Sequence, residues 1–468
     1  MQRDELAGHS KDELINLVLA QYEQLVRLQA AIEQLKADHE ALKYKFERNK
    51  KPPTTSKNSS QPPWRDQKSN QSKHRRKRKH GPPAGHEKHE RKLVAQADQV
   101  VELRPQHCHA CQSDLRQREG QLVRVNQVTE LPEASAQVIE VRQYQVSCPH
   151  CGHRELADAP AGLEMERRFG ARLEATVVYY RQEQHMSYER TQEAMQELYG
   201  VHLSQGGIDR IMQRAGQSAL ARVPAIQAEV ARSAVIHCDE TSSRVDGDNW
   251  WEWVFCTPGA VLHIMRDNRS ADTIQGVMGQ QVAEVWVSDC LSSQLKAPAQ
   301  MRQLCLAHQL RNLQALLDGH PHLVWAQEMR ARFQYAIQVY HQRHSLSPDV
   351  FKQQVSQVER ICDRLLERSN APPEAHRLLR RYKKHRQSLF VFLYRTDVEP
   401  TNNVAEQALR PSVIHRKVTY GFRSEWGAKV YAALASVIHT AELSGVCAFK
   451  SIQALFGAPA LPRLTGCE

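Results

Sequence analysis

Two short apolar segments that each end in an aspartate most constrain how this chain can fold. The first is the run 234–241, AVIHCDET, which brings Asp239 to the end of an apolar stretch. The second is the run 283–289, AEVWVSD, which ends at Asp289. Apolar runs of this length that stop at a polar turn are typical of buried strands, so each aspartate is expected at the end of a strand.

A third carboxylate belongs to a different kind of segment. Glu406 stands in the run 401–411, TNNVAEQALRP. This run predicts a helix that is capped by Thr401 or Asn402 and that ends or kinks at Pro411. Two strand ends and one helix could together present three carboxylates.

The order of apolar segments predicts the sheet that carries the two aspartates. Three strands joined by short connections favour an antiparallel meander: 233–239, 249–256 and 260–266. A helix capped by Ser270 then precedes the strand 283–289, which such a crossover makes parallel. The first and fourth strands would be neighbours in a mixed sheet of the ribonuclease-H type.

Three carboxylates at one site suit phosphoryl transfer. Mg²⁺, or Mn²⁺ in its place, prefers oxygen ligands and keeps waters for the substrate. Two such ions about 4 Å apart can activate an attacking oxygen and stabilise a leaving one. The ligands would be Asp239, Asp289 and Glu406. Taken singly, each has a plainer reading: a turn aspartate, a cap, and an exposed ion pair of Glu406 with Arg410.

Charge is concentrated in one segment of the 468-residue chain. Residues 47–92 hold 15 Lys and Arg against 4 Asp and Glu, which accounts for the whole net charge of +11. The segment is rich in Pro, Ser and Lys and is expected to be a disordered linker that contacts DNA phosphates or acts as a solubilising tail. Its densest basic tract is Arg75, Arg76, Lys77, Arg78 and Lys79.

The stretch 11–46 precedes this linker and has a heptad of apolar residues without Pro or Gly. It predicts a coiled-coil helix that pairs subunits into a homodimer or a larger homo-oligomer. An amphipathic helix packed on its own chain is the alternative.

Two Cys-x-x-Cys pairs lie within residues 93–160, a region expected to be a small zinc-binding β module. Two pairs of thiolates complete a tetrahedral zinc site, and the 112–147 segment between them could form a β-meander. A redox pair, or histidine ligands in place of cysteines, are the alternatives. The predicted structural zinc ligands are Cys108, Cys111, Cys148 and Cys151.

Helical periodicity marks most of the remaining chain. In 161–230, a helix opening at 187–190, a break at Gly200 and a helix from Ser204 through Arg214 are compatible with a DNA-binding helix-turn-helix or with a plain helical hairpin. The remaining parts are expected to be a first catalytic segment, a helical insertion, a second catalytic segment with the Glu406 helix, and a C-terminal tail: 231–318, 319–395, 396–445 and 446–468.

The start of the chain is charged, and no apolar run approaches the ~20 residues that span a bilayer. We therefore expect no membrane association and a reducing, cytoplasmic setting with nucleoid association when DNA is bound.

Four motifs resemble those of the insertion sequence 66 family of transposases. The runs 237–241, HCDET, and 287–290, VSDC, resemble its two aspartate motifs, and 305–308, CLAH, resembles its Cys-x-x-His segment. The run 402–411, NNVAEQALRP, is similar to its Asn-Asn-x-x-Glu motif. The resemblance covers most of the chain and implies a DDE-type catalytic domain with a helical insertion before the glutamate.

The resemblance implies a DNA transposase that cleaves element ends and transfers strands into target DNA, with companion proteins of the same element as possible partners. The alternatives are a non-catalytic DNA-binding protein derived from a transposase and a metal-dependent nuclease that does not join strands. His308 is expected to bind DNA, to orient a phosphate or simply to pack. Phosphate contacts near the site, or a solvated basic face, are expected of Arg410, Arg416, Lys417 and Arg423.

Overall fold

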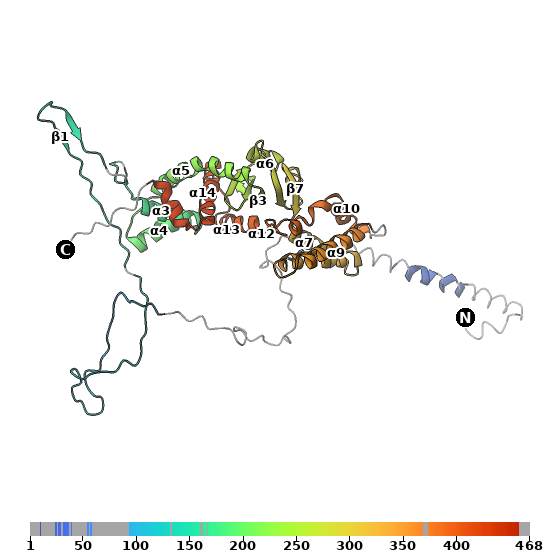
Figure 1. Ribbon diagram of the computed structural model, residues 1–468, viewed down its shortest axis with the longest axis horizontal. Coiled ribbons are helices and arrows are strands. Elements are labelled where there is room, and N and C mark those ends of the chain that lie inside the picture. Colours follow the sequence, from blue (N-terminus) through green and yellow to red (C-terminus); the bar gives the residue numbers. More distant parts are fainter. Residues whose placement is uncertain are drawn as a thin grey trace. The chain divides into compact units, whose positions relative to one another are not determined.

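The computed structural model describes residues 10, 24–25, 27–29, 31–36, 39, 54–55, 57–58, 93–131, 133–159, 162–165, 167–367 and 373–457 (Figure 1). The chain divides into two compact units. The larger includes the described parts of Val141–Gln192 and Leu203–Glu468, and the smaller those of Lys68–Glu140 and Glu193–His202.

The N-terminal segments are described only in part. Within 11–46, residues 24–25, 27–29, 31–36 and 39 are helical, as the heptad predicts. Pairing of this helix with a second copy stays a prediction. The basic tract 75–79 and most of the linker 47–92 lie outside the described residues.

Only two short strands form around the cysteine pairs. Strands β1 (Gln145–Ser147) and β2 (Arg154–Leu156) make an antiparallel hairpin. The β-meander expected over 112–147 is wrong for the described residues, which are irregular up to β1. The alternating apolar side chains face solvent, Val138 being 96% exposed. Because no second layer of the described residues buries them, strand pairing there would gain no stabilisation from packing.

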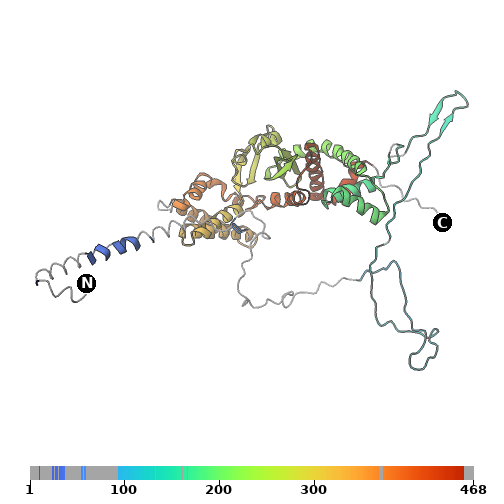
Figure 2. The ribbon, with the colours of Figure 1, turned by 180° about the vertical axis from the view of Figure 1, so that it is seen from behind.

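The next region is helical, as expected. It holds α3 (Ala171–Gln182), α4 (Tyr188–Tyr199) and α5 (Gln205–Arg232). Ser204 caps α5 by accepting a hydrogen bond from the Gly207 amide, but α5 continues far beyond the expected end at Arg214. Buried apolar side chains recur along the length of α5. This helix lies beside α14 (Glu425–Leu443) in both views (Figure 2). The predicted helix-turn-helix role stays a prediction.

A five-stranded mixed sheet forms the centre of the larger unit. Its strand order is β5-β4-β3-β6-β7, with β3 antiparallel to β4, β4 antiparallel to β5, and β3, β6 and β7 parallel. The mixed sheet predicted from the sequence is therefore confirmed. The strands are β3 (Val235–Val245), β4 (Asp248–Cys256), β5 (Val261–Arg266), β6 (Ala283–Ser288) and β7 (Ala299–Leu304).

Helices cover both faces of this sheet. On one face, α5 and α6 (Ala271–Met278), the latter capped by Ser270, share a core with Ile236 and Trp286. On the other face, Val235, Val285 and Val287 pack into one core with the helices between β7 and residue 400. These are α7 (Leu306–Gly319), α8 (Val324–His341), α9 (Pro348–Glu367), α10 (His376–Lys384) and α11 (Val391–Tyr394).

The two ends of this helical segment meet. The Leu306 amide, at the start of α7, donates to the Pro400 carbonyl at 2.9 Å. The chain then forms α12 (Asn403–Ala408) and α13 (Arg410–Thr419), with Pro411 in the first turn of α13. The expected break at Pro411 is therefore confirmed, and α12 is left as a short, separate helix.

The described part of the expected C-terminal tail contains a helix. Helix α15 (Ala448–Gln453) lies within the stretch 446–468, and its Ile452 is fully buried. Residues 458–468 lie outside the described part of the chain. No helix in the described ranges is both long enough and apolar enough to cross a membrane. Single 3-10 turns occupy Gln294–Lys296, Pro373–Ala375, Arg386–Ser388 and Ala454–Phe456.

Candidate active site

The register between β3 and β6 aligns the two predicted aspartates. His237 lies opposite Val287 in this parallel pair. The same offset carried two residues further brings Asp239 opposite Asp289, which directly follows β6. Because side chains alternate between the faces of a strand, Asp239 shares the face of His237. This is the face covered by α7 and α12.

Asp239 is half-buried among other acidic groups. Burial, followed by the charges of Glu240, Asp289 and Glu406, holds its pKa well above the usual range of an aspartate. Its Oδ1 accepts one hydrogen bond from the Glu240 amide at 2.9 Å, which opposes this shift only in part. A cation beside Asp239 would therefore be stabilised by several carboxylates at once.

Asp289 has the capping role considered for it. Its Oδ1 accepts a hydrogen bond from the Leu291 amide at 2.7 Å, as a turn-capping aspartate does. Its Oδ2 takes no part in that bond. Capping with one oxygen fixes the carboxylate at the strand end and is compatible with a ligand role for the other.

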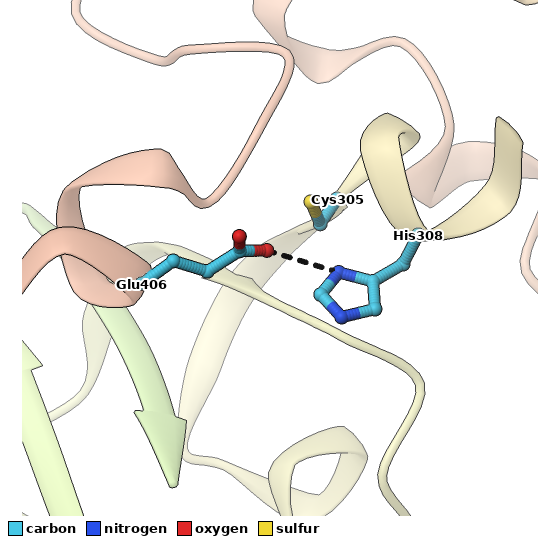
Figure 3. Close-up of side chains that lie close together, drawn as sticks. All are labelled: Cys305, His308 and Glu406. Carbon is cyan, nitrogen blue, oxygen red and sulfur yellow. Dashed lines mark ion pairs between the residues drawn. The ribbon is translucent and has the colours of Figure 1, made fainter. Parts of the chain in front are cut away.

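Glu406 projects from α12 toward α7. Its Oε1 lies 3.2 Å from Arg311 Nη2 and 3.5 Å from His308 Nδ1 (Figure 3). The exposed ion pair considered with Arg410 is not among the ion pairs of the described chain, and Arg410 is exposed. Sequence reasoning missed Arg311, although it stands three residues after His308 and therefore on the same side of the helix.

Asn402 fastens α12 to the strand that bears Asp239. Its side chain is fully buried, its Nδ2 donates to the Cys238 carbonyl at 2.8 Å, and its Oδ1 lies 3.2 Å from His237 Nδ1. Its backbone amide donates to Cys305 Sγ at 3.2 Å. Asn402 is the N-cap residue of α12, but its side chain makes no capping hydrogen bond because both polar atoms contact residues of β3.

Glu240, next to Asp239, faces the opposite side of the sheet. It is buried, forms an ion pair with Arg269 and accepts a hydrogen bond from Gln294. Burial raises its pKa, and Arg269 opposes that shift. Glu240 is thus held by Arg269 and Gln294, and it supports β3 on the face opposite Asp239.

One group in the described part of the chain has three potential metal ligands close together. The ligand atoms of Cys305, His308 and Glu406 all lie within 4.8 Å of one another. Cys305 is buried, and burial raises the pKa of its thiol to about 11. Asp239 and Asp289 do not belong to this group, and Glu406 Oε1 lies near Arg311 and His308 instead.

The predicted phosphate-binding residues follow α12 and have different environments. Arg416 Nη1 donates to Thr241 Oγ1 at 3.2 Å and to the Ser242 carbonyl, so Arg416 joins α13 to β3. The other three are exposed to solvent: Arg410, Lys417 and Arg423.

The two cysteine pairs form matching turns. The Gln112 amide donates to the Cys108 carbonyl at 2.8 Å, and the Gly152 amide donates to the Cys148 carbonyl at 2.9 Å. Both Gln112 and Gly152 have a positive φ, as tight metal-binding turns require.

One cysteine in each turn has a lowered thiol pKa, which favours the thiolate form that binds a cation. Hydrogen bonds from Ser113 lower the pKa of Cys111, and backbone hydrogen bonds from Cys151 and His150 lower that of Cys148. Each turn therefore favours thiolate ligands. The pairs belong to different compact units, so one zinc ion shared by all four cysteines stays a prediction.

The expected position of Asp239 at a strand end is wrong, because β3 continues through Val245 in its pairing with β4; Asp289 directly follows β6 as expected. Acidic residues on neighbouring parallel strands of a mixed sheet are an arrangement suited to metal-assisted phosphoryl transfer. The sequence matches the family described as Transposase IS66 family over residues 166–430. The chain belongs to this transposase family. The matched region contains all three predicted carboxylates and excludes both cysteine pairs. No curated protein matches the chain.

Membership of a transposase family makes DNA the partner in general terms and implies use of a divalent metal. It does not define the residues that bind either one.

Proposed function

We propose that this protein cleaves phosphodiester bonds at the ends of a mobile element and transfers the freed strands into target DNA. The observation that carries the proposal is the alignment of Asp239 with Asp289 on the face of the sheet that α12 covers with Glu406. The proposed core is of the ribonuclease-H type, with the helices between β7 and α12 as its insertion.

The donor set fits the hard cations that this chemistry uses. All three groups offer carboxylate oxygens. The pKa of Asp239 is raised first by burial and then by neighbouring carboxylates, and a cation would offset both effects. Mg²⁺ or Mn²⁺, two ions per site, would be held by Asp239, Asp289 and Glu406 and would supply Lewis acidity to the attacking and leaving oxygens.

The protein's own contribution is positioning and charge. Leu291 and Glu240 hold one oxygen of each aspartate through their backbone amides. Arg311 holds Glu406 beside α7 through a hydrogen bond, and His308 lies next to the same carboxylate. Hydrolysis at the element end and attack by the freed 3′-hydroxyl are both in-line displacements, so one fixed set of groups can serve both.

DNA would be bound by several parts of the chain. Arg410, Lys417 and Arg423 would contact phosphates near the site, and Arg416 would add to them from its anchored position. The zinc module and α4–α5 would hold the element ends. The basic tract 75–79 would add salt-sensitive affinity, and the N-terminal helix would pair two subunits.

Replacing Asp239 with Asn tests the catalytic proposal. The variant keeps the size of the side chain but loses the charge, so Mg²⁺-dependent cleavage of element-end DNA and strand transfer should both disappear. Unchanged cleavage and joining would contradict the catalytic role proposed for Asp239, whereas absence of cleavage by the wild type itself would favour the non-catalytic DNA-binding alternative.

A second assay separates transposase from nuclease. DNA with pre-cleaved element ends bypasses the first step and supplies the 3′-hydroxyl directly. Joined products with target DNA are expected. Cleavage of intact ends without any joining of pre-cleaved ends would assign the nuclease alternative instead.

A further inference from the structure

Cys305, His308 and Glu406 form a cluster whose donors differ from those of the aspartates. Their ligand atoms lie within 4.8 Å of one another, and His308 Nδ1 and Glu406 Oε1 are 3.5 Å apart (Figure 3). Tetrahedral zinc with bonds of roughly 2.0–2.3 Å requires ligand atoms about 3.5 Å apart. Small side-chain rotations would therefore close the cluster around one ion.

The backbone already holds these three residues together. Cys305 is the N-cap residue of α7 and His308 lies in its first turn, so their side chains leave the same turn of the helix. The first turn of α7 is joined to the segment before Glu406 by two hydrogen bonds, from the Leu306 amide to Pro400 and from the Asn402 amide to Cys305 Sγ. Little ordering would remain to be done when an ion binds.

The chemistry of the donors selects the ion. Thiolate and imidazole favour zinc over magnesium, whereas carboxylates alone favour magnesium. His308 Nδ1 is buried and has no hydrogen-bond partner within the described ranges, so it is free to act as a ligand. Glu406 thus stands between a soft donor pair on α7 and the hard aspartates on the strands.

We propose that Cys305, His308 and Glu406 bind a thiophilic divalent cation of the zinc class, and that this ion withdraws Glu406 from the two aspartates. Binding would release the Cys305 thiol proton to solvent and would displace Arg311 from Glu406. Zinc would then inhibit the Mg²⁺-dependent reaction. The inhibitory part rests on the proposed function, whereas the binding part does not.

The first test counts zinc on the purified full-length chain after equilibrium dialysis against Zn²⁺ with excess Mg²⁺. Cys305→Ser and His308→Gln should each bind one zinc ion fewer per chain than the wild type. Cys362→Ser, which removes a buried cysteine from α9, should bind as much zinc as the wild type. Equal zinc counts for all four proteins would overturn the proposed site. A lower zinc count for Cys362→Ser would also overturn it, because zinc binding would then depend on the integrity of the fold and not on Cys305.

The second test measures Mg²⁺-supported cleavage of element-end DNA against increasing Zn²⁺. The zinc concentration that halves each protein's own rate should rise at least about tenfold in Cys305→Ser, and not in Cys362→Ser. Zinc bound through Cys305 without inhibition would overturn the regulatory claim. Absence of any Mg²⁺-supported cleavage would reject the proposed function, while the zinc count would still decide the site.

Discussion

Replacing Asn402 with Ala should show how much one side chain contributes to the free energy of unfolding by joining α12, the helix of Glu406, to the sheet. The change deletes the hydrogen bond to the Cys238 carbonyl and the contact with His237 Nδ1, both of which are buried. A buried polar group left without its partner costs about 1–3 kcal/mol. Two such groups, with some relaxation, should lower the free energy of unfolding by roughly 2–4 kcal/mol.

Urea denaturation measures this change as a lower midpoint with an unchanged slope. Asn403→Ala is the matched control, because Asn403 is the next residue of the motif and is exposed. Its effect should stay within about 0.5 kcal/mol. Asn402→Ala should also lose more cleavage activity than Asn403→Ala, since Glu406 follows one turn later on α12. Equal midpoints and equal activities for the two variants would refute the role assigned to Asn402.

Three further changes test other parts of the structure. Asp239→Asn removes repulsion, so the metal-free protein should melt at a higher temperature and lose its stabilisation by Mg²⁺; a lower melting temperature would contradict the acidic cluster. Burial lowers the pKa of His415 to about 3 from an ordinary 6.5, so the unfolded chain binds the proton first and the free energy of unfolding falls as the pH drops across that interval. In His415→Phe, denaturation midpoints should fall less steeply over that range, and an unchanged slope would count against the assignment. Gly421 has a φ of +121°, and a Cβ there would lie 2.6 Å from the Arg244 carbonyl oxygen. Gly421→Ala should therefore lower the free energy of unfolding by about 1–3 kcal/mol in urea titrations, and an unaltered midpoint would contradict the close approach.

The sheet could be predicted because short sequence segments determine its strands and their order. The apolar runs before Asp239 and Asp289 define strands, and the helix between β5 and β6 makes the crossover parallel. The parallel pairing then brings Asp239, inside β3, beside Asp289, which follows β6. That β3 continues past Asp239 was not predicted. The positions of the catalytic residues themselves remain predictions.

The role of Asn402 could not be predicted, because its partners lie about 165 residues away in the sequence. From one sequence, an asparagine that caps a helix cannot be distinguished from one whose side chain bonds to a distant strand. Arg311 was missed for a similar reason, since its partner Glu406 is on another helix. The strands expected over 112–147 failed because alternation predicts a strand only where a second surface buries the apolar side. The extra length of α5 comes from burial against the rest of the larger unit, which overrides the weak local signals for an end at Arg214.

The helices α7–α11 separate β7 from α12 in the sequence, yet they form a layer of the fold. Val235, Val285 and Val287 on the sheet share a core with Phe333 and the other buried residues of these helices. A shortened enzyme that lacked them would uncover an apolar sheet face beside the acidic residues. Miniaturising such a protein would therefore require a redesigned, polar sheet surface, whereas changes in length are best tolerated in the connections between these helices.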